Sequence, residues 1–346
     1  MAKSYVTDLK PGDTVDSSFA VRSKSLQPFR NKPGSYLALT LADKTGEIPA
    51  RAWDEAEKLA ERFEVGEVIR LRGRVDEYQG AAQIIVQRVK KLDPDEVDAL
   101  DYLPSTPKDV EALLARVREA VASVRNEHLA ALLRAFFDDA EFVRRFAEGP
   151  GAKSLHHAYL GGLLEHVVSV LEMCEMVCRL HPQLDRDLLV TAALLHDVGK
   201  LEELHFDTTI DYTDTGRLVG HVILTDRMVS QRLAQLPGFP VELREVLAHT
   251  LLSHHGAREW GAPIVPMTPE AITLHYLDNL DAKIWQFSQI AGQAAAAGRR
   301  WSEWQRLLER YVYSGAWGLE VPVSSEEAGG EGQSGLADAG SRPGLE

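Results

Sequence analysis

The sequence predicts a multidomain protein of α and β structure, with a five-stranded β-barrel first, an all-α domain after it and a disordered tail. Three observations support this prediction. Alternating apolar and β-branched segments fill the first part, apolar residues three and four positions apart dominate the middle, and Gly, Ser and Glu dominate the end. We therefore expect a barrel domain at 1–95, a linker at 96–108, an α-helical domain at 109–320 and a tail at 321–346.

The first domain contains five segments of β type, which Gly, Asp and Asn separate. They are SSFAVRSKSLQPF, SYLALTLAD, GEIPARAW, EVIRLRGRVDEY and AAQIIVQRVKKL. One helical segment, DEAEKLAERF, interrupts them, and the glycines in DKTGE and EYQGAA stand where hairpin turns are expected. Five strands with one helical interruption are typical of a Greek-key barrel of the OB type, a fold that binds oligonucleotides.

The stretch LDPDEVDALDYLPSTPKD is acidic and contains three prolines, which is typical of a linker. From Asp109 the apolar period becomes helical, and Ser105 or Thr106 before Pro107 is the expected helix start. Helical segments then continue through WSEWQRLLERYVY at 301–313. The exception is DTTIDYTDT at 207–215, where a short hairpin is the alternative.

Composition limits the classes of function. A formal net charge of −14 argues against a protein that holds nucleic acid by bulk charge alone. The first 100 residues are nearly balanced in charge, so a polyanion would meet this part or a site neutralised by metal. Because no long apolar run and no apolar signal core appear, we expect a cytoplasmic protein without membrane contact. Cys174 and Cys178 are expected to be packed thiols on one helix face.

Seven histidines and aspartates in the helical part have the spacing of a paired-metal site: His166, His196, Asp197, His221, His254, His255 and Asp278. Taken singly, each fits a surface histidine or a helix cap. An adjacent His-Asp at the end of an apolar helix is harder to explain, because either group is costly to bury unpaired. A divalent metal accepts imidazole nitrogen and carboxylate oxygen together, and facing helices commonly build such sites.

The order of histidine, His-Asp and aspartate at 166, 196–197 and 278 resembles the HD superfamily of metal-dependent phosphohydrolases, over about 150–290. SLHHAYLGGLLEH at 154–166, preceded by an OB-like domain, resembles the YhaM-type 3′–5′ exoribonucleases over most of the chain. The resemblance implies two divalent metals, with manganese expected and iron, nickel or zinc left open. The first metal would take His166, His196, Asp197 and Asp278. The second would share Asp197 as a bridge and take His221, His254 and His255.

We assign catalytic roles to Asp197, as the bridging carboxylate, and to Lys200, which is placed to meet a phosphate or the leaving group. The alternative for Lys200 is a lysine at a helix C-terminus. The candidate substrate-binding residues are His156, His157, Arg217 and Arg227 in the helical part and Arg30, Lys32, Arg72, Arg74 and Tyr78 in the barrel. For His156 and His157 a role in orienting ligands is the alternative, and for the arginines a solvated surface. Trp53 is expected in the barrel core.

The predicted function is a metal-dependent 3′–5′ exonuclease acting on single-stranded RNA, with single-stranded DNA left open as a second substrate. In this prediction two metals activate the attacking hydroxide. Two alternatives stay open. One is a phosphohydrolase of small nucleotides or cyclic dinucleotides, and the other is a single-strand-binding protein with an inactive metal site. The sequence leaves a homo-oligomer open.

Overall fold

The computed structural model describes residues 3–29, 33–78, 80–153 and 157–315. The chain divides into two compact units, with the boundary between Trp285 and Gln286. The predicted tail at 321–346 lies outside the described residues, as do Arg30, Lys32 and His156.

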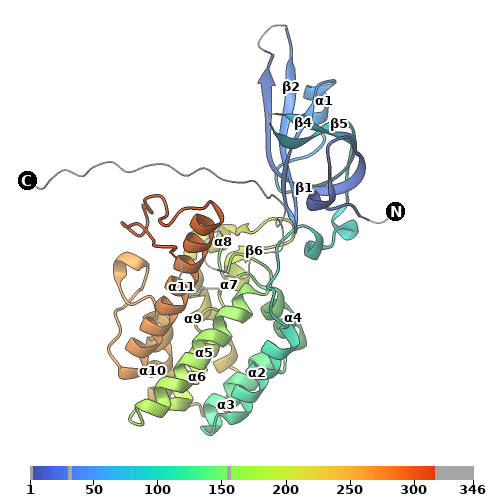
Figure 1. Cartoon of the computed structure of the whole chain (residues 1–346). Helices are drawn as coiled ribbons and strands as arrows, with labels where there is room; N and C mark the ends of the chain where they lie inside the picture. The colour runs from blue at the N-terminus through green and yellow to red at the C-terminus, as the bar shows by residue number, and fades with distance from the viewer. Residues whose placement is uncertain (1–2, 30–32, 79, 154–156, 316–346) are drawn as a thin grey trace, which may run out of the picture. The chain divides into compact units, whose positions relative to one another are not determined.

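The first part of the chain is a closed β-barrel, which confirms the OB-type prediction (Figure 1). Its strands are β1 (Thr14–Pro28), β2 (Ser35–Asp43), β3 (Gly46–Ala52), β4 (Val68–Tyr78) and β5 (Ala81–Lys91). The order around the barrel is β1-β2-β3-β5-β4, and the short helix α1 (Ala56–Ala60) follows β3. The pair β3–β5 is parallel and the other pairs are antiparallel.

Alternation of buried and exposed side chains along β4 separates the barrel core from its outer surface. In β4, Ile69, Leu71 and Val75 are buried, whereas the intervening arginines are exposed. Phe19 on β1 and Leu41 on β2 fill the same core. Because successive side chains in a strand point to opposite faces, the pattern that buries the core also fixes which residues face outward.

The helical part confirms the all-α prediction. Its helices are α2 (Val110–Ser123), α3 (Glu127–Phe137), α4 (Ala140–Glu148), α5 (Gly162–Leu180), α6 (Arg186–Leu195), α7 (Lys200–Glu203), α8 (Asp214–Val219), α9 (His221–Leu233), α10 (Val241–Leu252) and α11 (Pro269–Ala296). Single 3₁₀ turns lie at Val6–Asp8, Pro94–Glu96, Ala99–Asp101 and Arg258–Trp260. The strands β6 (Leu204–His205) and β7 (Asp211–Tyr212) form a short hairpin, of which only β7 lies in the segment 207–215 where a hairpin was the alternative.

The predicted start of the first long helix is wrong. Asp109, and not Ser105 or Thr106, is the N-cap of α2, because its carboxylate accepts hydrogen bonds from the backbone amides of Glu111 and Ala112. Thr106 instead donates its hydroxyl hydrogen bond to Glu165 of α5.

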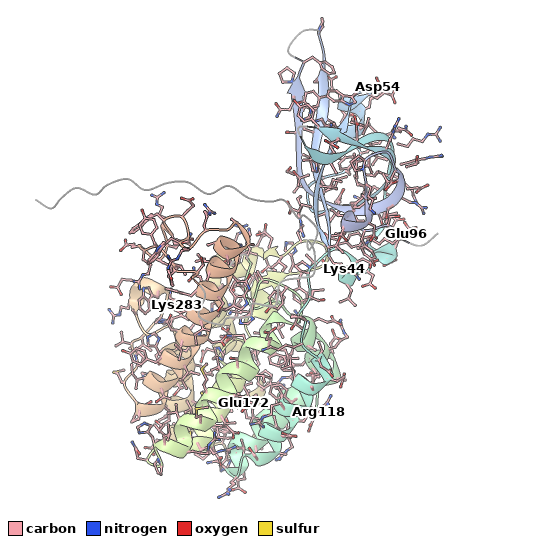
Figure 2. All side chains as sticks on the ribbon, viewed as in Figure 1. Lys44, Asp54, Glu96, Arg118, Glu172 and Lys283 are labelled. Atoms are coloured by element: carbon pink, nitrogen blue, oxygen red, sulfur yellow. The ribbon has the colours of Figure 1, made fainter. Side chains whose placement is uncertain are left out.

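Helix α5 packs against α6 and forms the centre of the helical core (Figure 1). Leu163, Val167 and Leu189 are fully buried there, and Cys174 is a buried free thiol that packs among them. The solvent-facing sides of α2 and α5 carry Arg118 and Glu172 (Figure 2). Within the described residues, none of the helices combines the length and the apolar character that crossing a membrane requires.

The prediction that 301–313 is helical is wrong. Two isolated bridges, Trp301 to Tyr313 and Gln305 to Arg310, cross this segment instead. The rings of Trp301 and Tyr313 meet edge to face with centroids 4.8 Å apart. Aromatic residues favour such cross-strand pairs, and here that pairing outweighs the helical spacing of the apolar residues. The buried core of this unit contains Ala291, Leu308 and Val312.

Candidate metal centre

The seven candidate ligands come from five separate places in the helical part. His166 lies on α5, His196 and Asp197 lie in the turn between α6 and α7, and His221 begins α9. His254 and His255 follow the end of α10, and Asp278 lies on α11. The structure brings all seven together, and the distances below define two groups of nitrogen and oxygen atoms around Asp197.

The first group faces the Oδ2 atom of Asp197. The Nε2 atoms of His166 and His196 lie 3.5 and 3.4 Å from this oxygen. These two nitrogens are 3.3 Å apart, and the His166 Nε2 atom lies 3.1 Å from the Oδ1 atom of Asp278. The imidazoles of His166 and His196 therefore converge on one oxygen of Asp197, and Asp278 contacts the first of these imidazoles.

The second group faces the other oxygen of Asp197. The Nε2 atoms of His221 and His254 lie 3.5 and 3.7 Å from Oδ1. The Nε2 atom of His255 lies 3.2 Å from that of His221. Asp197 thus presents one oxygen to each group, as a carboxylate that bridges two cations must.

The turn that carries His196 and Asp197 is held tightly against the start of α9. The Thr225 hydroxyl accepts a hydrogen bond from the Gly199 amide at 2.9 Å and donates one to the His196 carbonyl at 3.0 Å. A Cβ atom at Gly199 would lie 2.2 Å from the His221 carbonyl oxygen. Only glycine allows this approach, which places Asp197 beside His221.

The outward-facing nitrogen of each histidine has its own partner. The Nδ1 atoms of His166 and His221 contact Asp281 and Glu203, and those of His196, His254 and His255 contact the carbonyls of Ala193, Leu251 and Trp260, at 2.6–3.0 Å. A carbonyl oxygen only accepts, so in the last three histidines Nδ1 carries the proton. Their Nε2 lone pairs are therefore left for the centre.

One nitrogen in the centre has no hydrogen-bond partner among the described residues. The Nε2 atom of His254 is buried, and it is the sole buried side-chain nitrogen or oxygen in the described part of the chain that lacks a partner. An unsatisfied buried acceptor is costly, and a divalent cation would satisfy it. The donor set of imidazole nitrogens and carboxylate oxygens therefore fits a metal site.

Burial and neighbouring charges hold most of these groups in the protonation state that binds a metal. Burial lowers the pKa of His254 and of His255, which keeps both imidazoles neutral. Burial raises the pKa of Asp197, but Lys200 and His196 outweigh it and hold that pKa well below its usual range. For His166 burial lowers the pKa, but hydrogen bonds to Asp278 and Asp281 raise it to about 9. A metal at His166 would displace a proton.

Lys200 is buried, and its Nζ atom lies 2.5 Å from the Oδ2 atom of Asp197. It begins α7, a single helical turn of four residues that follows the His-Asp pair, and the ion pair with Asp197 orients its side chain. The cation therefore faces the centre.

Two acidic residues that are absent from the predicted set, Asp281 and Glu203, accept hydrogen bonds from the Nδ1 atoms of two candidate ligands. Asp281 accepts hydrogen bonds from the Nδ1 atom of His166 at 2.7 Å and from the Ser169 hydroxyl. Glu203 accepts from both the backbone amide and the Nδ1 atom of His221, at 2.9 and 3.0 Å. Asp281 lies one helical turn after Asp278, and this spacing signals a shared face. No sequence pattern connects Glu203 to His221.

The structure places His157 beside the centre, and Arg217 and Arg227 on the surface. His157 is 3% exposed and contacts Asp281 and Tyr159, which favours the orienting role over substrate contact. Arg217 is exposed and pairs with Asp211 at 2.9 Å. Arg227 is exposed more than one turn beyond His221 on α9.

In the barrel, Arg72 and Arg74 face outward on β4, and Tyr78 is exposed at its end. The expectation that Trp53 lies in the barrel core is wrong, since its side chain is 37% exposed. Ala52 is buried, so strand alternation turns the next residue outward.

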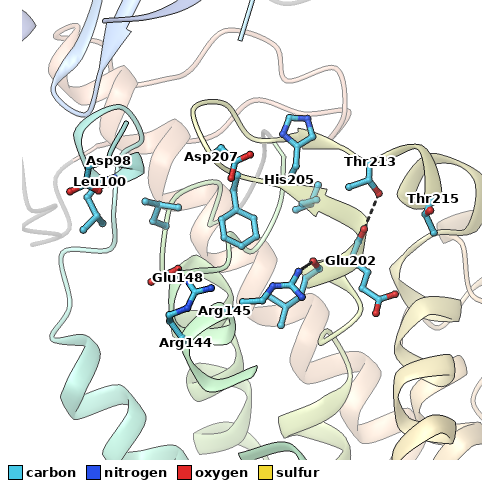
Figure 3. A pocket seen from close by; sticks show the side chains of 14 residues that line it. Asp98, Leu100, Arg144, Arg145, Glu148, Glu202, His205, Asp207, Thr213 and Thr215 are labelled. Carbon is cyan, nitrogen blue, oxygen red and sulfur yellow. Dashed lines mark hydrogen bonds and ion pairs between the residues drawn. The ribbon is translucent and has the colours of Figure 1, made fainter. Parts of the chain in front are cut away.

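A separate cavity of about 730 Å³ is lined by Arg144, Arg145, Glu148, Glu202 and Asp207, among others (Figure 3). Arg144 is paired with Glu141 and Glu148, and Arg145 donates to the Leu201 carbonyl. Arg144 and Arg145 therefore already have partners, and none of the candidate ligands lines the cavity.

Comparisons with known proteins agree with this architecture. Residues 163–283 match the HD domain, and residues 19–92 match an OB-fold nucleic acid binding domain. A curated relative from Geobacillus sp. (strain WCH70), named 3′-5′ exoribonuclease YhaM, is 34% identical over 286 residues, which are 82% of this chain and 86% of that protein. The chain belongs to the YhaM family. As a member of this family with an HD domain, it is a metal-dependent hydrolase that also contains an OB-fold nucleic acid binding domain.

Two solved structures are similar to the barrel. One is the second OB-fold domain of replication protein A from Methanococcus maripaludis, with 18% identity, a TM-score of 0.23 and coverage of 27% of this chain and 96% of that one. The other is Pot1pC of Schizosaccharomyces pombe bound to ssDNA, with 14% identity, a TM-score of 0.24 and coverage of 28% and 90%.

Proposed function

We propose that this YhaM-family protein removes nucleotides from the 3′ end of single-stranded RNA, by hydrolysis at the centre around Asp197. The observation that carries the proposal is the placement of the two Asp197 oxygens, one toward each group of histidines. In the proposed assignment His166, His196, Asp197 and Asp278 hold one cation. Asp197, His221, His254 and His255 hold the other.

Two divalent cations bound in this way would neutralise the phosphodiester and activate the attacking water. The bond from phosphorus to the 3′ oxygen breaks, and a new bond to the water oxygen forms. The leaving oxygen needs a proton or a positive charge, and Lys200 is the buried cation beside Asp197 that can supply it. Asp197 stays ionised because Lys200 and the surrounding histidines stabilise its negative charge.

In the proposed division of labour the barrel domain at 1–95 holds the strand and the helical domain at 109–320 cleaves it, with 96–108 as the linker. We also propose manganese as the working metal and the cytoplasm as the location. The curated relative is named an exoribonuclease, which supports RNA as the substrate. Single-stranded DNA is the substrate that the test must separate from RNA.

The test is a timed digestion of 5′-labelled single-stranded RNA by the full chain with Mn²⁺. We compare the unchanged protein with Asp197→Asn and with Glu172→Gln, a solvent-exposed control on α5 (Figure 2). The expected result is a ladder that shortens from the 3′ end, absent in Asp197→Asn and unchanged in Glu172→Gln. The same digestion on DNA of equal sequence measures substrate preference.

An intact RNA strand after incubation with metal-loaded protein would contradict the proposal. Hydrolysis of small nucleotides or cyclic dinucleotides by the same preparation would then identify a phosphohydrolase. Absence of bound divalent metal after supplementation, measured by elemental analysis, would instead indicate a binding protein with an inactive site.

A further inference from the structure

The loop between α10 and α11 is bonded to two of the candidate ligands (Figure 1). It begins with His254 and His255, and the carbonyl of Trp260 in this loop accepts the Nδ1 hydrogen of His255 at 2.9 Å. On α11 the Nδ1 atom of His275 donates to the His254 carbonyl at 2.8 Å. A Cβ atom at Gly256 would overlap the His275 ring, so only glycine lets the loop lie this close to α11. The loop and the start of α11 therefore form one rigid border of the centre.

Two exposed aromatic rings lie on this border. The ring centre of His275 is 5.9 Å from that of Trp260 and 5.0 Å from that of Tyr276. His275 is 6% exposed, whereas Trp260 is 61% exposed and Tyr276 is 63% exposed. We call Trp260 and Tyr276 the ring pair. A buried imidazole that is bonded to the backbone of a candidate ligand thus contacts two rings that face solvent.

The centre is open to solvent next to the ring pair. Three of the seven candidate ligands are partly exposed, namely His221, His255 and Asp278. The other four, His166, His196, Asp197 and His254, are buried. His255 is the ligand bonded to the Trp260 carbonyl, and Asp278 lies three residues after His275, on the same side of α11. A substrate that reaches the centre from solvent therefore passes beside the ring pair.

The chemistry of the loop favours an unpaired base as the group that covers these rings. Arg258 and Glu259, in the same 3₁₀ turn as Trp260, are both exposed, so this turn carries no net charge and stacking must supply the affinity. Every base has a flat π face that stacks on an aromatic ring. At a 3′ end only one nucleoside lies beyond the phosphate that is cleaved, so one platform beside the centre is sufficient to hold it.

We propose that Trp260 binds the base of the 3′-terminal nucleotide by stacking, with Tyr276 beside it, while the phosphate to be cleaved lies at the centre. The proposal rests on the proposed function and extends it, because it names the site that holds the leaving nucleotide. Stacking accepts any base, which suits an enzyme that must remove each nucleotide in turn. The site also measures one nucleotide from the free end, which favours removal of single nucleotides over internal cleavage.

The test compares the first cleavage of two 5′-labelled RNAs of equal sequence by the full chain with Mn²⁺. One RNA ends in an ordinary nucleotide, and the other ends in an abasic ribose that keeps the phosphate and the hydroxyls. On the ordinary end Trp260→Ala should raise KM by about tenfold and leave kcat within about twofold, because stacking holds the substrate and the transition state alike. On the abasic end the same substitution should change KM by less than about twofold.

Two variants and one binding measurement control the test. Trp260→Phe keeps a flat ring and should retain most of the affinity for the ordinary end. Trp304→Ala removes another exposed tryptophan, in the second compact unit, and should leave both KM values unchanged. Isothermal titration with Mn²⁺ should give Trp260→Ala the affinity of the unchanged protein, because the backbone carbonyl and not the indole holds His255.

Three results would overturn the proposal. They are an unchanged KM of Trp260→Ala on the ordinary end, an equal rise of KM on both ends, and a changed molecular mass of Trp260→Ala in light scattering. The last result would identify the ring pair as a contact between copies of the chain. Failure of the proposed function gives a different result, since the unchanged protein then leaves both RNAs intact. Failure of the stacking site alone leaves the ordinary RNA shortened with the same KM by both proteins.

Discussion

The metal centre and the outer surface of the barrel are built in opposite ways. In the centre His166, His196, Asp197 and His254 are buried, and the Nδ1 atom of each of the five histidines has a partner that fixes its ring. On the barrel surface the rings of Tyr36, Trp53 and Tyr78 and the Arg51 guanidinium are at least partly exposed. They meet through ring contacts and cation–π contacts. The comparison indicates that a reaction needs fixed atoms, whereas a strand that must slide needs a surface tolerant of any base.

The largest effect is expected at the atom that joins the two groups of histidines. Asp197→Asn keeps the shape but removes the charge and one coordinating oxygen, so metal content and initial rate on RNA should both fall by more than about 100-fold. Binding of single-stranded RNA without metal should stay within about twofold, since the barrel domain is unchanged. Elemental analysis, digestion and anisotropy measure the three quantities. If binding of single-stranded RNA fell together with metal content, the metal centre and the barrel would not work independently.

The second effect tests whether the residues that bond to the Nδ1 atoms of the histidine ligands hold those ligands in position. Asp281→Ala removes the acceptor of the His166 Nδ1 proton, and metal affinity should fall by about 10- to 100-fold. Excess Mn²⁺ should restore much of the rate, and Asp281→Asn should lose less because its amide oxygen still accepts. Isothermal titration with Mn²⁺ measures the affinity directly. If Asp281→Ala binds Mn²⁺ like the unchanged protein, Asp281 does not position His166.

The third effect concerns stability. Gly199→Ala would force a Cβ atom against the His221 carbonyl and the Thr225 amide. The turn or α9 must shift, which should lower the free energy of unfolding by about 1–3 kcal/mol and weaken metal binding with it. Urea unfolding measures the first quantity. Ser230→Ala, an exposed substitution on α9, is the control, and equal stability of the two variants would contradict the close approach.

The smallest effect concerns charge: it compares the salt dependence of RNA binding by the barrel with the Mn²⁺ affinity of the metal centre. Arg74→Ala should reduce the slope of log affinity against log salt for single-stranded RNA by about 1. Mn²⁺ affinity should stay the same, because the arginine lies in the barrel. Anisotropy titrations at several salt concentrations measure the slope. Arg118→Ala on α2 is the control and should leave it unchanged (Figure 2).

The sequence was informative where chemistry restricts residue type and spacing. The candidate ligands were identified because few structural roles explain His-Asp after an apolar helix, and the barrel because its strands alternate so regularly. Glu203 was missed because it approaches His221 through the close contact of the α7 turn with α9. That contact depends on tertiary packing and leaves no local pattern.

The exposed aromatic residues of the barrel were predicted only in part. Tyr78 was among the candidate substrate residues, but an aromatic residue by itself is as typical of a core as of a binding surface, and Trp53 was assigned to the core on that basis. The register between β2, β3 and β5 decides the matter, because it sets Tyr36, Trp53 and Arg51 on one side. The helix predicted at 301–313 failed similarly, since the Trp301–Tyr313 pairing is not visible in a helical period.

The unpartnered Nε2 atom of His254 has a consequence for the life of the protein in the cell. A chain folded without metal keeps a buried acceptor unsatisfied, which costs about 1–3 kcal/mol. Any cation that binds the native centre and not the unfolded chain adds its binding free energy to the stability of the fold. Metal supply would therefore set how long each molecule survives proteolysis, and starvation for the metal would lower the amount of enzyme as well as its activity.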